Sequence, residues 1–97
     1  MPIQPAVYML ASGRNGTLYI GVTGHLLQRV WQHRNHIVEG FTSRYDATSL
    51  VWFEQHPTME PAILRETRLK RWRRADKIRL IEAANPYWKD LWSVIAV

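Results

Sequence analysis

The chain has 97 residues, of which 46% are hydrophobic, and a formal net charge of +5 at pH 7. This length and composition supply one hydrophobic core, so we expect a single domain over residues 1–97. The absence of cysteine excludes disulfides, thiolate nucleophiles and cysteine-based zinc sites, and the apolar runs are too short to span a membrane.

The N-terminal residues indicate in which cellular compartment the protein is expected. Residues 1–5 have neither the charged segment nor the apolar stretch of a secretory signal peptide. Together with the lack of cysteine, this predicts a cytoplasmic protein that makes no contact with membranes.

Two runs rich in β-branched and aromatic residues, 6–11 and 17–23, predict a β-hairpin. Asn15 and Gly16 tolerate positive φ, so we expect a type I′ turn there. A two-residue loop would pair Tyr8 with Thr23, and a four-residue loop would pair Tyr8 with Gly21. Either loop gives the hairpin one aliphatic face, made by Val7, Met9, Ala11, Leu18, Ile20 and Val22.

The opposite face of the hairpin carries Tyr8, Leu10, Tyr19, Gly21 and Thr23. Two phenols lie there beside a glycine, which leaves room for a ligand or another backbone to approach. Tyrosines on a strand are more often packing residues, so each of them alone is a weak indication of a site.

A helix over residues 24–39 should follow, with Thr23 as its N-cap and Gly40 as its C-terminal stop. Arg29 and His33 lie next to each other at the edge of its apolar stripe, so we expect both to be half-buried. The stripe itself is made by Leu26, Val30 and Ile37, widened by Leu27, Trp31 and Val38.

The region after this helix predicts a loop and then a third strand. Residues 41–49, with Tyr45, show no periodicity and should form a loop. Residues 50–56 are nearly all apolar, which is typical of a strand buried on both faces, and Pro57 ends it. A second helix then runs from the N-cap Thr58 toward Trp72, with Pro61 in its first turn.

Glu66 lies in the middle of the inward face of this second helix, among Met59, Ala62, Ile63 and Leu69. A carboxylate on an apolar face costs several kcal/mol if it stays charged and unpaired, so it should have a cation, a metal ion or a raised pKa. The alternative is a solvated ion pair with Lys70, four residues on, although the position of Glu66 on the helical wheel argues against it.

The C-terminal part predicts a third helix over residues 77–84, begun by Asp76 and ended by Pro86. Lys77 and Arg79 should lie exposed on it. We interpret Asn85 as the N-cap of a short last turn that Pro86 opens. The aromatic residues of that turn should close the core: Tyr87, Trp88 and Trp92.

Basic residues are concentrated between Arg65 and Arg79. This segment holds eight of the thirteen lysines and arginines and only two acidic residues, which gives it a net charge of +6. A local positive field of this kind suits a polyanion such as nucleic acid, although it can also be a solvated helix face. The candidate nucleic-acid-binding residues are Arg68, Arg71, Arg73, Arg74 and Lys77.

Taken together, the hairpin motifs Ala6-Val7-Tyr8 and Tyr19-Ile20-Gly21, followed by Arg29 on one helix and Glu66 on a later one, resemble the GIY-YIG nuclease family. The resemblance covers nearly the whole chain and is closest to the small stand-alone bacterial subfamily. One departure is Ala6, which stands where the family motif begins with glycine.

This resemblance implies an α/β fold of the α+β type, with a three-stranded antiparallel sheet flanked by helices in the order ββαβαα. It also implies hydrolysis of DNA phosphodiesters with one divalent ion, Mg²⁺ or Mn²⁺. Position by position, it assigns catalytic roles to Tyr8, Tyr19, Arg29 and His33 and the metal to Glu66, with Gly21, Tyr45 and Asn85 in support.

The chemistry of these residue types fits such a reaction. Arg29 can fork onto a phosphate, and a single carboxylate with waters can hold Mg²⁺. Tyr8 is the first choice for the general base because Arg29, the metal and the basic field should favour its phenolate. His33 could accept the proton from Tyr8 or act directly.

Three hypotheses for the function follow. The leading one is a metal-dependent DNA endonuclease in repair or recombination, directed by DNA structure, such as branched or single-stranded DNA, or weakly by sequence, with a protein partner able to supply specificity. The second is a nucleic-acid-binding module with weak or no turnover. The third is a protein-interaction domain that binds an acidic partner through its basic face.

Overall fold

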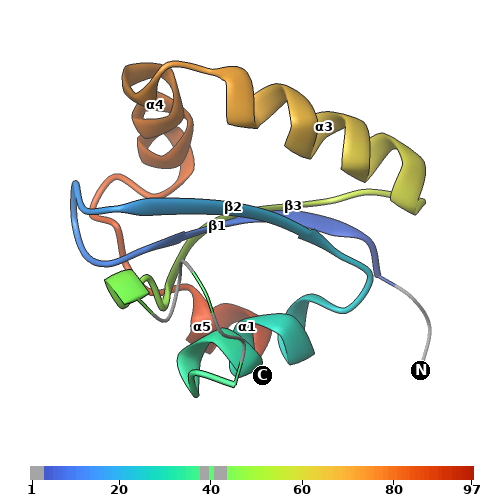
Figure 1. Ribbon diagram of the computed structural model, residues 1–97, viewed down its shortest axis with the longest axis horizontal. Coiled ribbons are helices and arrows are strands. Elements are labelled where there is room, and N and C mark those ends of the chain that lie inside the picture. Colours follow the sequence, from blue (N-terminus) through green and yellow to red (C-terminus); the bar gives the residue numbers. More distant parts are fainter. Residues whose placement is uncertain (1–3, 38–39, 41–43) are drawn as a thin grey trace.

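The computed structural model describes residues 4–37, 40 and 44–97. It contains one three-stranded antiparallel sheet with the strand order β2-β1-β3, and helices on both of its faces (Figure 1). This is the fold class that the resemblance to the GIY-YIG family implies. The elements are β1 (Ala6–Ala11), β2 (Leu18–Thr23), α1 (Leu26–Arg34), β3 (Ser49–Gln55), α3 (Met59–Arg71), α4 (Arg74–Ala84) and α5 (Trp92–Ile95).

The sheet separates two apolar layers. α3 and α4 cover one face, and α1 and α5 cover the other (Figure 1). The aliphatic hairpin face packs under α3 and α4, where Val7, Met9 and Ile20 meet Leu69 and Ile81. The Tyr8 face packs against α1 and α5, so both faces of the central strand β1 are buried. None of the helices described is long and apolar enough to cross a membrane.

The hairpin adopts the longer of the two predicted loops. Tyr8 pairs with Gly21, and Gly16 N–H donates to the carbonyl of Gly13 at 2.9 Å. The turn is therefore centred on Arg14 and Asn15, and only Asn15 of the expected pair has a positive φ, 57°. The predicted type I′ turn at Asn15 and Gly16 is therefore wrong both in position, by one residue, and in type, because Arg14 lacks the positive φ that a type I′ turn requires. Gly16 is closely packed instead, because a Cβ there would lie 2.3 Å from Ser12 Oγ and 3.1 Å from the backbone N and O of Gly13.

The first helix is shorter than predicted. α1 starts after His25, because the Thr23 hydroxyl accepts from His25 N–H at 3.0 Å and leaves the N-cap to His25. It ends at Arg34, well before Gly40, and His36 takes a left-handed φ of 54°. Ile37 is therefore exposed and not part of the apolar stripe. Residues 38–39 of the predicted helix and 41–43 of the predicted loop lie outside the described residues.

The next two elements form as predicted. β3 is buried at Leu50, Val51 and Trp52, and α3 follows the N-cap Thr58, although the Thr58 side chain makes no capping hydrogen bond. Arg44 and Tyr45, expected in a loop, are helical.

The third helix begins three residues before its predicted start. α4 starts at Arg74, and Asp76 is an ion-pair partner of Arg73 and Arg79. Arg74 donates to the carbonyls of Asn15 and Gly16, at 2.8 and 2.7 Å, and so ties α4 to the hairpin turn. Lys77, expected to be exposed, is partly buried.

The interpretation of Asn85 as the cap of a short turn is confirmed in part, because its side-chain oxygen accepts from the backbone N–H of Lys89 at 3.0 Å and its carbonyl accepts from Trp88 N–H at 3.1 Å, but no helix follows directly. Asn85 is buried at the end of α4, and its amide donates to the carbonyls of Val51, at 3.0 Å, and Lys89, at 2.9 Å. It therefore fastens the C-terminal segment to β3. Trp88 is buried in the core as predicted, but Tyr87 is 71% exposed and does not close it.

Candidate active site

The Tyr8 side chain is the centre of the candidate site. It projects from the central strand β1 toward α1, and its phenol oxygen lies 3.1 Å from Nε2 of His33. Both side chains are almost fully buried. His33 occupies the core-facing side of α1, one turn after Arg29, and this places its imidazole over the sheet. A buried pair of polar groups with this geometry is a satisfied hydrogen bond between two groups that can exchange a proton.

Gly21 explains how the phenol fits into this layer. It faces Tyr8 across the strand pair, and a Cβ built on Gly21 would lie 2.4 Å from both the Cζ and the Oη of Tyr8. We expected the missing side chain to leave room for a ligand or another backbone. The Tyr8 ring itself fills that space, so Gly21 is required for the position of the phenol.

Tyr19 completes a cluster of three rings. Its ring centroid lies 6.2 Å from that of Tyr8 and 5.4 Å from that of His33. Tyr19 belongs to the edge strand β2 and is partly exposed, and it also lines a shallow surface cavity with Lys70 and Lys77. The cluster therefore has one side that is open to a substrate.

The surroundings of Tyr8 and His33 shift the pKa values of these two buried groups in opposite directions. Burial raises the pKa of the Tyr8 phenol, as do Tyr19 and the charge of Glu66, and they outweigh the lowering by Arg29. The expected effect of Arg29 on the Tyr8 pKa is therefore confirmed, but the protein groups together shift this pKa away from the phenolate. Burial, followed by Arg29, lowers the pKa of His33, so its imidazole is neutral at neutral pH and can accept a proton.

Arg29 is exposed and not half-buried as predicted. It lines a small cavity of about 100 Å³ beside the N-terminus of α1, together with Thr23, His25, Gln28 and Gln32. Its charge acts on the pKa of both Tyr8 and His33. The guanidinium is therefore available to an anion while it stays within electrostatic reach of the ring cluster.

Glu66 approaches from α3, on the opposite face of the sheet. Its side chain is only 15% exposed, and Oε2 lies 3.1 Å from Nζ of Lys70, which is 55% exposed. The expectations that Glu66 faces inward and has a cation beside it are thus confirmed, and the cation is Lys70, which reaches the largely buried carboxylate from the surface. The argument from the helical wheel against a pair with Lys70 is wrong. The inward face is also narrower than predicted, since Ile63 is exposed.

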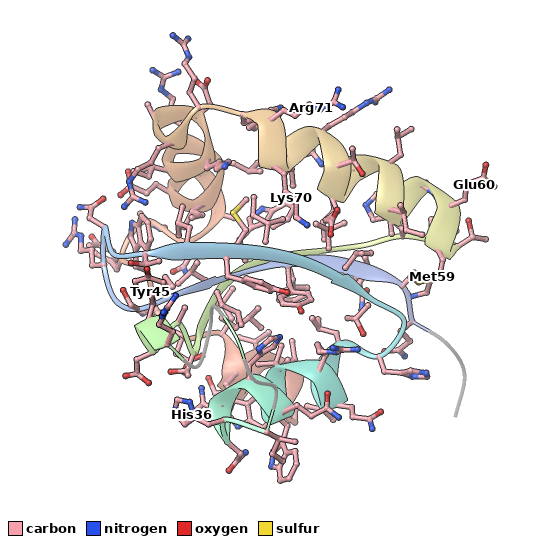
Figure 2. The ribbon with its side chains drawn as sticks, viewed as in Figure 1. His36, Tyr45, Met59, Glu60, Lys70 and Arg71 are labelled. Atoms are coloured by element: carbon pink, nitrogen blue, oxygen red, sulfur yellow. The ribbon has the colours of Figure 1, made fainter. Side chains whose placement is uncertain are left out.

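Lys70 was not among the predicted site residues, and the sequence analysis named it only as a possible ion-pair partner of Glu66. Figure 2 shows it on the sheet-facing side of α3, whereas the next residue, Arg71, projects from the outer side. Its spacing of four residues from Glu66 was the available signal. Lys70 therefore competes with any metal ion for the Glu66 carboxylate.

The remaining predicted site residues lie elsewhere. Tyr45 is exposed on the side of the molecule that holds the hairpin turn (Figure 2), and Asn85 serves the contact between α4 and β3. Of the basic residues, Arg73 pairs with Asp76, and Arg74 holds the turn. Lys77 donates to the carbonyl of Lys70 at 3.5 Å. Arg68 and Arg71 are exposed on α3.

The carboxylates and histidines of the described residues fit a metal site that has a single protein ligand. Among the described residues, no three His, Asp or Glu side chains gather in one place. Mg²⁺ can be held through one or two carboxylates together with waters and substrate phosphates. Glu66 can provide the carboxylate for such a site, provided that Lys70 releases it.

A comparison with protein families matches the GIY-YIG catalytic domain over residues 4–79. The chain belongs to the GIY-YIG family. GIY-YIG domains are nucleases, and the matched range contains Tyr8, Tyr19, Arg29, His33 and Glu66. No curated protein and no solved structure matches the chain.

The GIY-YIG match ends within α4. A residue beyond the matched range, Asp90, nevertheless helps to hold α1, which carries Arg29 and His33, against the sheet. Asp90 forms an ion pair with Arg34 at the end of α1 and accepts from the backbone N–H of Leu50 and Trp92, at 3.2 and 3.0 Å. No local pattern in the sequence singles out Asp90, because its partners are 40 or more residues away or backbone groups.

Proposed function

We propose that this GIY-YIG protein is a divalent-metal-dependent endonuclease that hydrolyses DNA phosphodiester bonds by direct attack of water. The observation that carries the proposal is the buried hydrogen bond between Tyr8 and His33, beside Tyr19 and within reach of the opposite charges of Arg29 and Glu66. In-line displacement at phosphorus needs a proton acceptor, a cation for the phosphate oxygens and stabilisation of the leaving oxygen. These residues offer the first two.

His33 is the final proton acceptor in this proposal. With its proton on Nδ1, the neutral imidazole presents Nε2 as an acceptor to the Tyr8 hydroxyl. As water attacks phosphorus, the Tyr8 oxygen takes the water proton and the Tyr8 hydroxyl proton passes to His33. The raised pKa of Tyr8 favours this relay over a standing phenolate, because the phenol never has to carry a full negative charge.

Arg29 binds the scissile phosphate. Its exposed guanidinium can donate two parallel hydrogen bonds to nonbridging oxygens and offset the charge that grows there. Tyr19 stands at the open side of the ring cluster, where its hydroxyl can orient the phosphate or the attacking water.

Glu66 would hold one Mg²⁺ or Mn²⁺ ion, with waters and the substrate phosphate as its other ligands. When bound, the ion polarises the phosphate and stabilises the leaving 3′ oxygen. Lys70 has to move from Glu66 when the ion enters, and its ammonium group can then contact a DNA phosphate.

We propose further that residues 1–97 act as one domain of the small stand-alone bacterial subfamily, in DNA repair or recombination. Specificity would come from DNA structure, such as a branch or a single strand, or from a protein partner. Arg68, Arg71, Arg73, Arg74 and Lys77 would add phosphate contacts.

A cleavage assay tests the proposal. Purified protein is incubated with branched, single-stranded and duplex DNA in Mg²⁺, in Mn²⁺ and in EDTA. We expect cleavage only with a divalent ion, and loss of cleavage in Glu66→Ala and Arg29→Ala. Cleavage that survives both substitutions would come from a contaminant and would refute the assignment of the site.

The ion pair between Glu66 and Lys70 favours a second candidate, a nucleic-acid-binding module with weak or no turnover. If the carboxylate stays with Lys70, no metal site forms. DNA binding without cleavage in any divalent ion would select this candidate.

A further inference from the structure

A cavity between α1 and α5 lies next to the Arg29 pocket and has no part in the reaction described above. We infer that this cavity binds one unpaired nucleobase of the DNA substrate, stacked on the indole of Trp31. The inference rests on the proposed function, because it assumes that DNA approaches Arg29, and it names the feature of the substrate that this site recognises.

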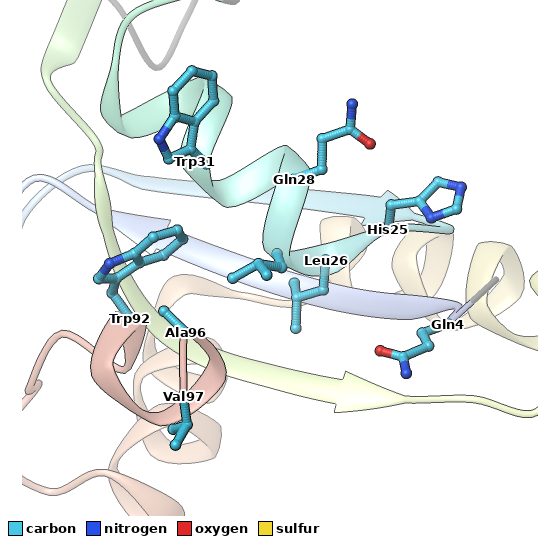
Figure 3. Close-up of a pocket in the computed structure, with 9 residues that line it drawn as sticks. Gln4, His25, Leu26, Gln28, Trp31, Trp92, Ala96 and Val97 are labelled. Atoms are coloured by element: carbon cyan, nitrogen blue, oxygen red, sulfur yellow. The ribbon is translucent and has the colours of Figure 1, made fainter. Parts of the chain in front are cut away.

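The cavity has the size and character of a ligand site. Its volume is about 520 Å³, within the range of roughly 300 to 1,000 Å³ that small-molecule pockets span. Figure 3 shows Trp31 of α1 and Trp92 of α5 near one end and Gln4 and His25 near the other. The lining residues are Gln4, His25, Leu26, Leu27, Gln28, Trp31, Trp92, Ala96 and Val97.

Trp31 is the stacking surface. Trp31 is 48% exposed, although the buried Leu26 and Val30 of the same helix pack into the core. An exposed tryptophan and leucine that share one concave surface indicate a binding site more strongly than a scattered apolar residue does. Stacking on a tryptophan is the common way in which proteins hold unpaired bases, and it tolerates any base because every base has a π face.

Trp92 forms the fixed wall of the cavity. The guanidinium of Arg34 lies 5.1 Å from the centroid of the Trp92 ring, and Arg34 is itself paired with Asp90. The backbone N–H of Trp92 donates to Asp90 at 3.0 Å. These three contacts fix Trp92 before any ligand binds. A base can therefore enter the cavity without the entropic cost of ordering the Trp92 side chain.

The cavity is also lined by polar side chains that can form hydrogen bonds with the edge of a base. Gln4 and Gln28 each carry an amide, which both donates and accepts hydrogen bonds. The backbone of Gln4 is fixed by a hydrogen bond to the carbonyl of Gly24, at 2.7 Å. An unpaired base presents free donors and acceptors on its Watson–Crick edge, and none of the nine lining side chains is acidic.

The position of the cavity ties it to the candidate active site. His25 and Gln28 line both this cavity and the small pocket that contains Arg29. A strand whose phosphate contacts Arg29 can therefore place a neighbouring base over the N-terminal turn of α1 and into the cavity. A paired base cannot enter, because it is stacked within the duplex, so the site favours DNA with a bulge, a frayed end or a single strand.

The test uses a short duplex with one unpaired 2-aminopurine, in EDTA so that binding is measured without cleavage. Stacking quenches 2-aminopurine fluorescence, and anisotropy of a labelled strand gives the affinity. We expect the native protein to quench the probe, Trp31→Ala to abolish the quenching and weaken binding about tenfold, and Trp31→Phe to restore most of both. Tyr87→Ala, which removes an exposed aromatic residue outside the cavity, should change neither.

Two controls separate this inference from the proposed nuclease. A duplex with an abasic site in place of the probe should bind the native protein and Trp31→Ala equally. If the native protein cleaves DNA but Trp31→Ala binds both duplexes as the native protein does, the base site is refuted and the nuclease stands. Quenching that depends on Trp31 without cleavage in either Mg²⁺ or Mn²⁺ supports the base site and refutes the nuclease. A Trp31→Ala variant that changes only self-association, measured by sedimentation, would make the cavity a contact between protein copies and overturn the inference.

Discussion

Nε2 of His33 lies 3.1 Å from the Tyr8 hydroxyl in a layer where both side chains are buried, and the pKa values of the two groups are shifted in opposite directions. The phenol is held as a neutral donor, and the imidazole is held as a neutral acceptor. Groups with pKa values moved apart by their surroundings are the usual mark of a divided acid and base role. In the proposed reaction, Tyr8 and His33 together act as the general base, because Tyr8 takes the proton from water and passes its own proton to His33.

Tyr8 and His33 should therefore act as one unit. We expect Tyr8→Phe and His33→Gln each to lower kcat by about 10²- to 10⁴-fold, the range for loss of a general base. The double variant should be no slower than the slower single variant, because either change already breaks the relay. Single-turnover cleavage at saturating Mg²⁺ measures the effect, with Tyr87→Phe as the control. Multiplicative losses in the double variant would mean that the two residues act separately.

The low pKa of His33 predicts the direction of the pH dependence. Because the neutral imidazole is the acceptor, cleavage should fall with decreasing pH through a value below 6.5, the usual pKa of histidine. Below pH 6.5 the unfolded chain binds the extra proton more readily, so stability should also fall as the pH decreases. NMR titration of His33 gives the pKa, and thermal unfolding between pH 7.5 and 5.5 gives the stability.

The contribution of Arg29 to this pKa can be separated from that of burial. Burial is the larger cause of the low pKa and Arg29 is the second, so Arg29→Gln should raise the pKa of His33 only part of the way toward 6.5. His33→Gln should remove the loss of stability that protonation of His33 produces. A His33 pKa above 6.5 in the native protein would contradict the relay.

The tight approach of Gly21 to Tyr8 predicts what an added methyl group does. A Cβ at this position would lie 2.4 Å from the phenol oxygen, so Gly21→Ala should displace the Tyr8 ring and destabilise the fold by about 1 to 3 kcal/mol. Displacement of the ring from His33 should lower kcat about 100-fold, the effect of a misplaced catalytic group. Val22→Ala, on the other face of the same strand, is the matched control for stability and should keep most of the activity.

The features of this site that were predictable from the sequence are those set by the alternation along a strand. That alternation puts Tyr8, Tyr19 and Gly21 on one face, and the structure keeps them there. The register was one of two predicted alternatives. The direction of the Tyr8 pKa was not predictable, because it depends on burial under α1, and the wheel of α1 alone did not show how deeply that layer is covered.

Two details of the sequence interpretation failed for different reasons. Asn85 looks like an N-cap before a proline, and its side-chain oxygen does accept from the backbone N–H of Lys89, but its amide also donates to Val51 of β3, 34 residues earlier in the chain. Asp76 looks like the start of a helix, but α4 begins two residues earlier, and the Asp76 carboxylate pairs with Arg73 and Arg79, three residues to either side. The first error reflects tertiary packing that no local pattern shows, whereas the second reflects a local choice between capping and ion pairing.

Lys70 should inhibit metal binding. Its ammonium group lies 3.1 Å from the carboxylate that is proposed to hold the ion. Lys70→Gln should lower the Mg²⁺ concentration at half-maximal cleavage several-fold. It should also lower the stability in the absence of metal by about 1 to 3 kcal/mol, since the largely buried Glu66 carboxylate loses its cation. A Mg²⁺ titration of the cleavage rate measures the first effect, and thermal unfolding measures the second. A higher Mg²⁺ requirement in Lys70→Gln would mean that Lys70 helps to build the metal site.

The basic residues on α3 and α4 should contribute unequally to DNA affinity, because some of them already have partners. Arg73 pairs with Asp76 and Arg74 holds the hairpin turn, whereas no ion pair of the described residues involves Arg68 or Arg71. Arg68→Gln and Arg71→Gln should each weaken binding and reduce the slope of log K against log salt by about 1, the value for one lost phosphate contact.

Anisotropy titrations over a range of salt concentrations, in EDTA, measure these slopes. Lys89→Gln removes an exposed lysine from outside the cluster and is the matched control for net charge. Arg74→Gln should reduce the slope less and lower the melting temperature more, because its guanidinium holds two carbonyls of the turn. If all the variants, Lys89→Gln included, reduce the slope equally, then DNA responds to the net charge of the protein and α3 carries no specific phosphate contact.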